Sequence, residues 1–187
     1  HTKTVRFGFR EFRGEGDHFT LNGTRINLRG DNVVVDSEVP HWVHYIPDPE
    51  SWEAIVDSML AQHMNVIRLH QQPAPEWMID ICDEKGMMVV AQSAIQANIP
   101  PRSTQYVDNC VTWVKEWIRR DRNHPSIVIW AGANEVYAPF ATKLLPEHLA
   151  RIDAAIKEQD PTRPILYEYS GDVHGLSPIT SWHYACG

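Results

Sequence analysis

The sequence Ser-Ile-Val-Ile-Trp-Ala-Gly-Ala-Asn-Glu, residues 126–135, decides the fold predicted for this chain. Its first five residues form a short, nearly continuous apolar run, which is typical of a parallel strand buried on both faces. Its last two residues, Asn134 and Glu135, bring an amide and a carboxyl group directly after that strand. In parallel barrels the active site lies at the carboxyl ends of the strands. The stretch therefore predicts a buried strand that ends in candidate site residues.

The same alternation of apolar runs and helical stretches extends to both sides of residues 126–135. The other predicted strands are residues 26–29, 65–69, 87–90, 164–167 and 179–184, and the predicted helices are residues 48–62, 76–85, 104–120 and 146–159. Six β units in succession, with no Gly-rich dinucleotide fingerprint after the first, favour a (β/α)8 barrel over a doubly wound sheet. A complete barrel has about 250 residues. We therefore predict an α/β fold, a partial TIM barrel with strands one to six.

Local signals fix several of these boundaries. Asn22-Gly23 lies between two alternating runs, which is a strong hairpin signal. Asp48 followed by Pro49 predicts a helix start, with the aspartate as N-cap and the proline at the first helical position. Gly86 predicts the end of the helix that precedes it.

Composition and charge indicate a globular domain and limit the kinds of partner that it is expected to bind. With 43% hydrophobic and 22% charged residues among 187, the chain has the composition of a globular domain with a real core. A formal net charge of -7 argues against a broad electrostatic contact with nucleic acid or an anionic membrane. No apolar run approaches the roughly 20 residues that cross a bilayer. Cys82, Cys110 and Cys186 are predicted to be free thiols, although one disulfide among them stays open, and so does the compartment, cytoplasmic or exported.

The stretch from Arg119 to Glu135 resembles glycoside hydrolase family 2, the family of β-galactosidases, β-glucuronidases and β-mannosidases. Other segments fall in family order, namely Phe7–Arg10 with Leu21–Gly23, Asn65–Arg68, Asp83–Gly86 and Asp160–Pro164. The resemblance therefore covers nearly the whole chain. It implies that residues 1–20 are the end of a preceding β-sandwich domain and its link, and that residues 21–187 are an incomplete TIM-barrel catalytic domain.

The resemblance implies a retaining glycosidase, in which two carboxyl groups stand about 5 to 5.5 Å apart. Glu135 matches the acid/base, and Asn134 matches the residue that contacts the 2-hydroxyl of the sugar. Arg68 matches an arginine that stabilises the ionised nucleophile. The nucleophile would be a glutamate after a seventh strand, downstream of Gly187, so we expect this chain alone to be inactive. Glu168 follows the fifth predicted strand, where the family places no nucleophile, and it is expected to be either a supporting residue or a solvated one.

The same resemblance implies further contacts at the barrel mouth. Tyr184 matches a tyrosine that hydrogen-bonds the nucleophile, and Trp182 and His183 are candidates for lining a sugar subsite. Asn32 belongs to the loop expected after the first strand and is a candidate substrate contact. In that loop Val34 stands where a substrate-contacting histidine is common.

No metal or cofactor is predicted. The stretch Ala91–Asn98 replaces a glutamate and a histidine that hold magnesium in some β-galactosidases, and neutral amides are poor substitutes on a hard cation. His124 is expected to orient the turn into the fourth strand, and Asp121–Asn123 to form a local charge network at the opposite end of the barrel.

Two other functions stay open beside the exo-acting glycosidase with a carbohydrate substrate. An endo-acting polysaccharide hydrolase of a related barrel family, such as an agarase or mannanase, is favoured by the loss of the terminal-sugar histidine at Val34. A non-catalytic carbohydrate-binding remnant is the other, because a barrel short of two strands exposes two sheet edges. The oligomeric state of the full-length protein is also open.

Overall fold

A computed structural model describes residues 4, 7–34, 48–96, 104–135, 146–168 and 175–181. Its elements, in chain order, are β1 (Phe12–Glu15), β2 (His18–Leu21), β3 (Thr24–Ile26), β4 (Gly30–Val34), α1 (Pro49–Ala61), β5 (Val66–His70), α2 (Glu76–Lys85), β6 (Met88–Gln92), α3 (Thr104–Asp121), β7 (Ile127–Ala133), α4 (Pro146–Gln159) and β8 (Ile165–Tyr167). Within the described part of the chain, no helix has the length and apolar character needed to cross a membrane.

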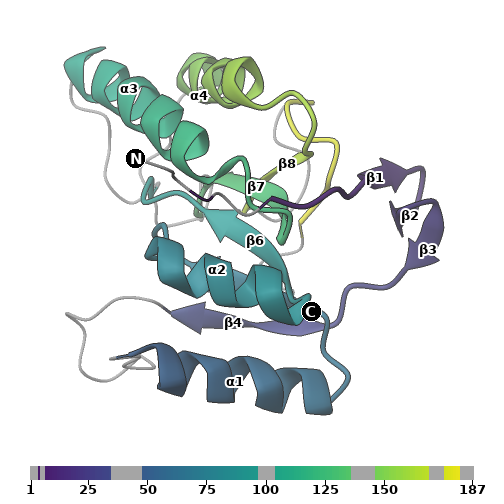
Figure 1. Ribbon diagram of the computed structural model, residues 1–187. Coiled ribbons are helices and arrows are strands. Elements are labelled where there is room, and N and C mark those ends of the chain that lie inside the picture. The colour runs from purple at the N-terminus through teal and green to yellow at the C-terminus, as the bar shows by residue number, and fades with distance from the viewer. Residues whose placement is uncertain are drawn as a thin grey trace, which may run out of the picture.

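A parallel sheet of five strands forms the main body, and its spatial order, β4-β5-β6-β7-β8, is the order along the chain. One of the helices α1 to α4 connects each pair of neighbouring strands. Figure 1 shows these helices following the sheet from α1 beside β4 to α4 near β8. A doubly wound sheet reverses its strand order at a switch point, and this sheet does not. The predicted partial α/β barrel is therefore confirmed.

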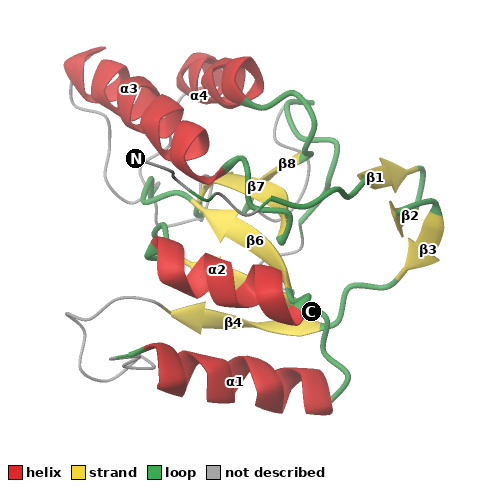
Figure 2. Cartoon of the chain, viewed as in Figure 1, coloured by secondary structure: helices red, strands yellow, loops and turns green. Residues whose placement is uncertain are grey.

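A small antiparallel sheet of order β1-β2-β3 precedes the parallel one and stands to one side of it in Figure 2. Leu21 and Thr24 are paired, and Asn22 and Gly23 between them have φ values of 51° and 75°. Two positive φ values in a two-residue loop are what a type I′ hairpin turn requires, which is why Asn-Gly suits it. The predicted hairpin is confirmed.

The first barrel strand differs from the prediction. It was expected at residues 26–29, but Ile26 ends β3 and the strand that pairs with β5 is β4, at Gly30–Val34. The prediction relied on apolar residues, and β4 has few of them because it begins with exposed Asp31 and Asn32. Gly30 permits the pairing, since a Cβ atom at this position would lie 1.7 Å from the Val66 carbonyl oxygen.

The helix boundaries follow the local signals. The Asp48 side chain accepts a hydrogen bond of 2.8 Å from the Ser51 backbone N–H, and Pro49 opens α1. Gly86 ends α2 in the left-handed conformation, with φ of 74°. The four helices and the strands β5 to β8 lie at their predicted places to within a few residues. Of the sixth predicted strand, residues 179–181 form only an isolated bridge at Ser181, and residues 182–184 lie outside the described ones.

Two apolar clusters lie on the two faces of the parallel sheet. The larger one joins the helices to the sheet and includes Trp52, whose indole N–H donates to the Met78 carbonyl at 2.8 Å. The smaller one joins Val66, Val90 and residues of β7 and β8 to the small antiparallel sheet. The small sheet therefore packs against the inner face of the barrel strands, on the side away from the helices.

Cys82 and Cys110 are free, as predicted, and Cys186 lies outside the described residues. Burial raises the pKa of the Cys82 thiol to about 12. Cys82 is thus a small core residue with no reactive thiolate at neutral pH.

Candidate active site

Strand alternation decides which side chains reach the interior of the barrel. On β5, Ile67 and Leu69 face the helices and Val66 faces the interior, so Arg68 is directed to the interior as well. The same alternation directs three more polar side chains to this inner face, at or near the carboxyl ends of their strands: Asn32 of β4, Gln92 of β6 and Glu168 after β8. The inner face of the sheet is therefore apolar along most of its length and polar at the carboxyl ends of the strands.

Arg68 is the centre of this layer. Its Nη1 donates to Asn32 Oδ1 at 3.0 Å, and its Nη2 donates to Asn134 Oδ1 at 2.8 Å. Its Nε forms an ion pair of 2.9 Å with Glu168 Oε1. One guanidinium thus links residues from β4, β5, the end of β7 and the end of β8. A planar group held on three sides has a fixed orientation.

Asn134 is held from both ends of its amide. Its Oδ1 accepts from Arg68, and its Nδ2 donates to Gln71 Oε1 at 3.1 Å. Its backbone N–H donates to the Ile95 carbonyl at 2.9 Å, and its side chain is almost fully buried. The amide that matches the sugar-contacting residue is therefore oriented before any ligand binds.

Glu135 follows Asn134 with φ of 52°, in the left-handed region. That region is uncommon for residues other than glycine and is found most often where function constrains the backbone. Glu135 is half-buried, whereas Asn134 beside it is buried. The strand end thus holds the amide inside and leaves the carboxyl group partly accessible.

His70 and Gln92 lie beside this network. The His70 Nδ1 atom is 3.4 Å from Gln92 Oε1. Burial and the nearby positive charge of Arg68 lower the pKa of His70, while Gln92, Glu135 and Glu168 act in the opposite direction. The imidazole is therefore neutral at neutral pH. Gln92 is fully buried, and its Nε2 atom has no hydrogen-bond partner among the residues that the structure describes.

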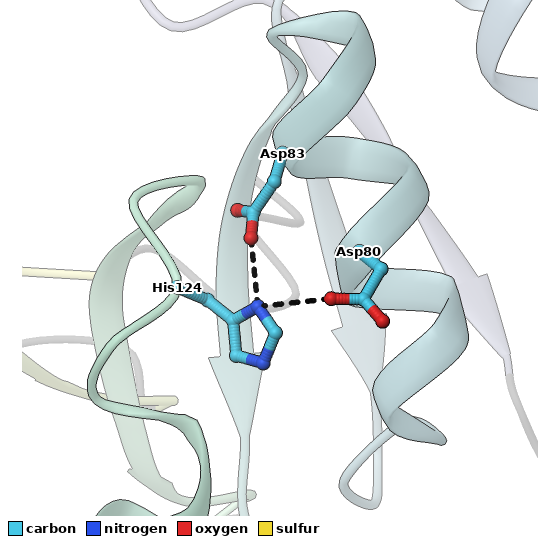
Figure 3. Close-up of side chains that lie close together, drawn as sticks. All are labelled: Asp80, Asp83 and His124. Atoms are coloured by element: carbon cyan, nitrogen blue, oxygen red, sulfur yellow. Dashed lines mark hydrogen bonds and ion pairs between the residues drawn. The ribbon is translucent and has the colours of Figure 1, made fainter. Parts of the chain in front are cut away.

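A second cluster lies at the opposite end of the strands, where β7 begins. Figure 3 shows Asp83 and Asp80 of α2 pointing toward the imidazole of His124. The Nδ1 atom lies 2.7 Å from Asp83 Oδ2 and 3.8 Å from Asp80 Oδ1. Asp83 Oδ1 accepts from the Ser126 backbone N–H at 2.8 Å. Both Asp83 oxygens and the His124 Nδ1 atom are thus engaged by protein groups.

This arrangement matches the orienting role expected of His124. The hydrogen bond to Asp83 is the largest cause that raises the pKa of His124. Nearby, Asp121 is fully buried and pairs with Arg120, and Arg122 donates to the Gln159 carbonyl at 2.9 Å. Of the charges predicted as a local network, Asp121 therefore pairs within α3, and Arg122 connects the end of α3 to the end of α4.

The predicted site residues divide into two groups. Glu135, Asn134, Arg68 and Asn32 lie together at the carboxyl ends of the strands. Tyr184, Trp182 and His183 lie outside the described residues, and so do Asn98 and the end of the 91–98 stretch. Gln71 and Gln92 were not among the predicted site residues. Their position after apolar runs was the available signal, but it does not distinguish them from other strand-end residues.

Comparison with known proteins gives a consistent result. Residues 14–185 match the family model described as glycosyl hydrolases family 2, TIM barrel domain. The β-galactosidase BgaC of Bifidobacterium adolescentis is 29% identical over 188 residues, which cover 92% of this chain and 17% of that protein.

Solved structures share the fold of this chain. A β-glucuronidase from Ruminococcus gnavus, in complex with an N1-substituted uronic isofagomine, superposes with a TM-score of 0.77 at 20% identity, over 93% of this chain and 30% of that one. A family 2 β-galacturonidase from Eisenbergiella tayi, bound to galacturonate, gives a TM-score of 0.71 at 25% identity, over 87% of this chain and 29% of that one. The chain spans less than a third of each of these proteins.

Proposed function

The chain belongs to glycosyl hydrolase family 2, as its TIM barrel domain, and from this premise we propose that it is part of a longer retaining β-glycosidase. The proposed reaction is hydrolysis of the O-glycosidic bond of a terminal β-linked sugar. The relatives named above are a β-galactosidase, a β-glucuronidase and a β-galacturonidase, which supports a sugar substrate without choosing among these sugars.

One observation carries this proposal: the Arg68 guanidinium holds the Asn134 side chain, and Glu135 follows directly in the chain. A hydrogen bond to a sugar hydroxyl accelerates the reaction only if it strengthens in the transition state, and that requires an amide already in place. Asn134, fixed at both ends and buried, meets this requirement.

In the proposed mechanism Glu135 acts twice. As the bond to the leaving group breaks, its carboxyl group donates a proton to the glycosidic oxygen while a carboxylate nucleophile attacks the anomeric carbon. In the second step Glu135 takes a proton from water, and the water oxygen replaces the enzyme carboxylate at the anomeric carbon. Its partly exposed position suits a group that must meet both the leaving group and water.

The nucleophile is proposed to be a glutamate in a part of the protein beyond residue 187. Arg68 is proposed to stabilise its negative charge as well as to hold Asn134. Asn32, Trp182, His183 and Tyr184 remain proposed contacts of the substrate or of the nucleophile.

The division of the chain at residue 20 also remains a proposal. The side chains of Phe7 and Phe9 are 68% and 92% exposed, and no strand includes them. Exposed aromatic side chains side by side are typical of a surface that another part of a protein covers. They support the proposal that the start of the chain belongs to a preceding β-sandwich domain and its link.

The stereochemistry and size of the products test this function. The full-length protein is incubated with aryl β-galactoside, β-glucuronide and β-mannoside and with a β-linked oligosaccharide, and the reducing sugar is followed by proton NMR. We expect single sugars that first appear in the β-configuration. A first product of α-configuration would refute the retaining mechanism, and a ladder of oligosaccharides would support the endo-acting alternative. Sugar binding without turnover would support the binding remnant.

A further inference from the structure

Glu168 is a buried carboxylate at the mouth of the barrel whose function the family assignment leaves open. It follows β8, and its backbone N–H donates to the Ala133 carbonyl at 3.2 Å, next to the end of β7. Its side chain is 7% exposed, and Oε1 forms the 2.9 Å ion pair with Arg68. Oε2 accepts a hydrogen bond of 3.3 Å from the Ser181 hydroxyl. Both carboxylate oxygens are therefore engaged.

We propose that Glu168 is a positioning residue of the glycosidase, whose carboxylate holds Arg68 in the orientation that fixes Asn134 beside Glu135. This inference rests on the proposed function, because it assigns to Glu168 a role in the same reaction. It concerns a residue that acts through Arg68 and does not touch the sugar.

The contacts of Arg68 explain why the carboxylate matters. The guanidinium is planar, and Asn32 and Asn134 contact its two terminal nitrogens through neutral amide oxygens. Glu168 contacts the Nε side and supplies a full negative charge. A guanidinium that loses a buried anionic partner is drawn toward other acceptors or water. Because Nη2 is the group that holds Asn134, a change in the plane of Arg68 moves the Asn134 amide.

The surroundings of Glu168 argue against a nucleophilic role. A nucleophile needs a carboxylate oxygen open to the anomeric carbon. Both oxygens of Glu168 contact protein groups, and the residue is buried. A carboxylate so enclosed is suited to holding a neighbour in place.

The test compares Glu168→Gln with a matched control in the full-length protein. Glu168→Gln keeps the shape and removes the charge. The control is Asp160→Asn, which removes the charge of another buried carboxylate paired with an arginine, Arg163. This pair precedes β8, whereas Glu168 follows it, so the control lies at the opposite end of the same strand. Both variants, together with Glu168→Asp, are assayed for kcat, KM and melting temperature on the same aryl glycoside.

We expect Glu168→Gln to lower kcat by about 100-fold, since a misplacement of about 1 Å costs roughly that much, with KM changed by less than about threefold. Asp160→Asn should lower the melting temperature and leave kcat within about twofold of wild type. Glu168→Asp should recover part of kcat, because it restores the charge.

A double variant tests whether Glu168 acts through Arg68. If it does, Glu168→Gln adds little further loss to Arg68→Gln, because the group that it positions is already gone. Multiplied losses would overturn the proposal, as would wild-type kcat in Glu168→Gln. Recovery of Glu168→Ala by azide, with an α-glycosyl azide as the product, would identify Glu168 as the nucleophile and overturn it too. Glu135→Gln is measured alongside. If Glu135→Gln is as active as wild type, the proposed function fails. If Glu135→Gln is inactive while Glu168→Gln is fully active, only the role of Glu168 fails.

Discussion

The contact between His124 and Asp83 predicts a local, pH-dependent stabilisation of the junction between α2 and β7. Asp83→Asn removes the carboxylate charge, although an amide oxygen at this position can still accept from the Ser126 N–H. The Asp83 side chain is 8% exposed and that of His124 is 14% exposed, so the charge-assisted bond of 2.7 Å is shielded from water. Hydrogen bonds of this kind contribute about 1.5 to 3 kcal/mol.

The sign of the pH dependence follows from the pKa shift. The pKa of His124 is raised in the folded protein, first by the hydrogen bond to Asp83 and further by Asp121 and Asp80, while burial opposes the shift. The stabilisation is therefore complete below the unfolded pKa of about 6.5, and it is lost as the pH rises through the higher folded pKa. Above that pKa the imidazole is neutral, so only its hydrogen bond to the Asp83 carboxylate remains, without the attraction between two opposite charges.

Hydrogen exchange followed by mass spectrometry measures this effect on peptides that cover α2 and residues 122–127. At pH 6, Asp83→Asn should speed exchange in these peptides by about ten- to a hundred-fold, with intrinsic rates corrected for pH. At pH 9 the difference should be smaller. Asp80→Asn is the matched control on the same helix, since Asp80 is 60% exposed and 3.8 Å from the same nitrogen, and we expect less than about threefold change. Equal effects of the two variants, or an effect of Asp83→Asn that does not change with pH, would refute the reasoning.

Two further predictions concern the strand pairing and the arginine. Gly30→Ala should destabilise the protein by about 3 kcal/mol or more, because its Cβ would lie 1.7 Å from the Val66 carbonyl oxygen, and hydrogen exchange across β4 and β5 measures this. Gly14→Ala is the control, because among the described residues its Cβ would have no neighbour nearer than 3.8 Å, and an equal loss of protection in both would contradict the reading. Arg68→Lys should lower kcat/KM by about 100-fold, since an ammonium group cannot contact Glu168, Asn32 and Asn134 together. A loss below about threefold would show that only the positive charge of Arg68 matters.

The sequence predicted best where a residue dictates local geometry by itself. Asn22-Gly23 formed its turn, Asp48 and Pro49 started α1, and Gly86 ended α2, because each depends on neighbours within a few residues. The prediction placed the first barrel strand too early in the chain. The true strand, β4, begins with exposed polar residues near the barrel mouth, and a search for apolar runs cannot find such a strand.

The candidate site could be predicted only in part. Position after a strand, together with the family resemblance, identified Glu135, Asn134 and Arg68. The contacts between them could not be read from the sequence, because Arg68 and Asn134 are 66 residues apart and meet only when the three strands β5, β6 and β7 align. The ion pair between Arg68 and Glu168 has the same origin. Such contacts depend on strand register, and register is a property of the whole sheet.

The central claim is that Glu135 is the acid/base, and its most direct test is the leaving-group dependence of Glu135→Gln in the full-length protein. For an aryl glycoside with a poor leaving group, which needs a proton, kcat should fall by at least about 100-fold. For a dinitrophenyl glycoside, which leaves without one, formation of the glycosyl-enzyme should be nearly unchanged, and added azide should speed its breakdown and give a β-glycosyl azide. Near wild-type rates on both substrates, or equal loss on both with no effect of azide, would contradict the assignment.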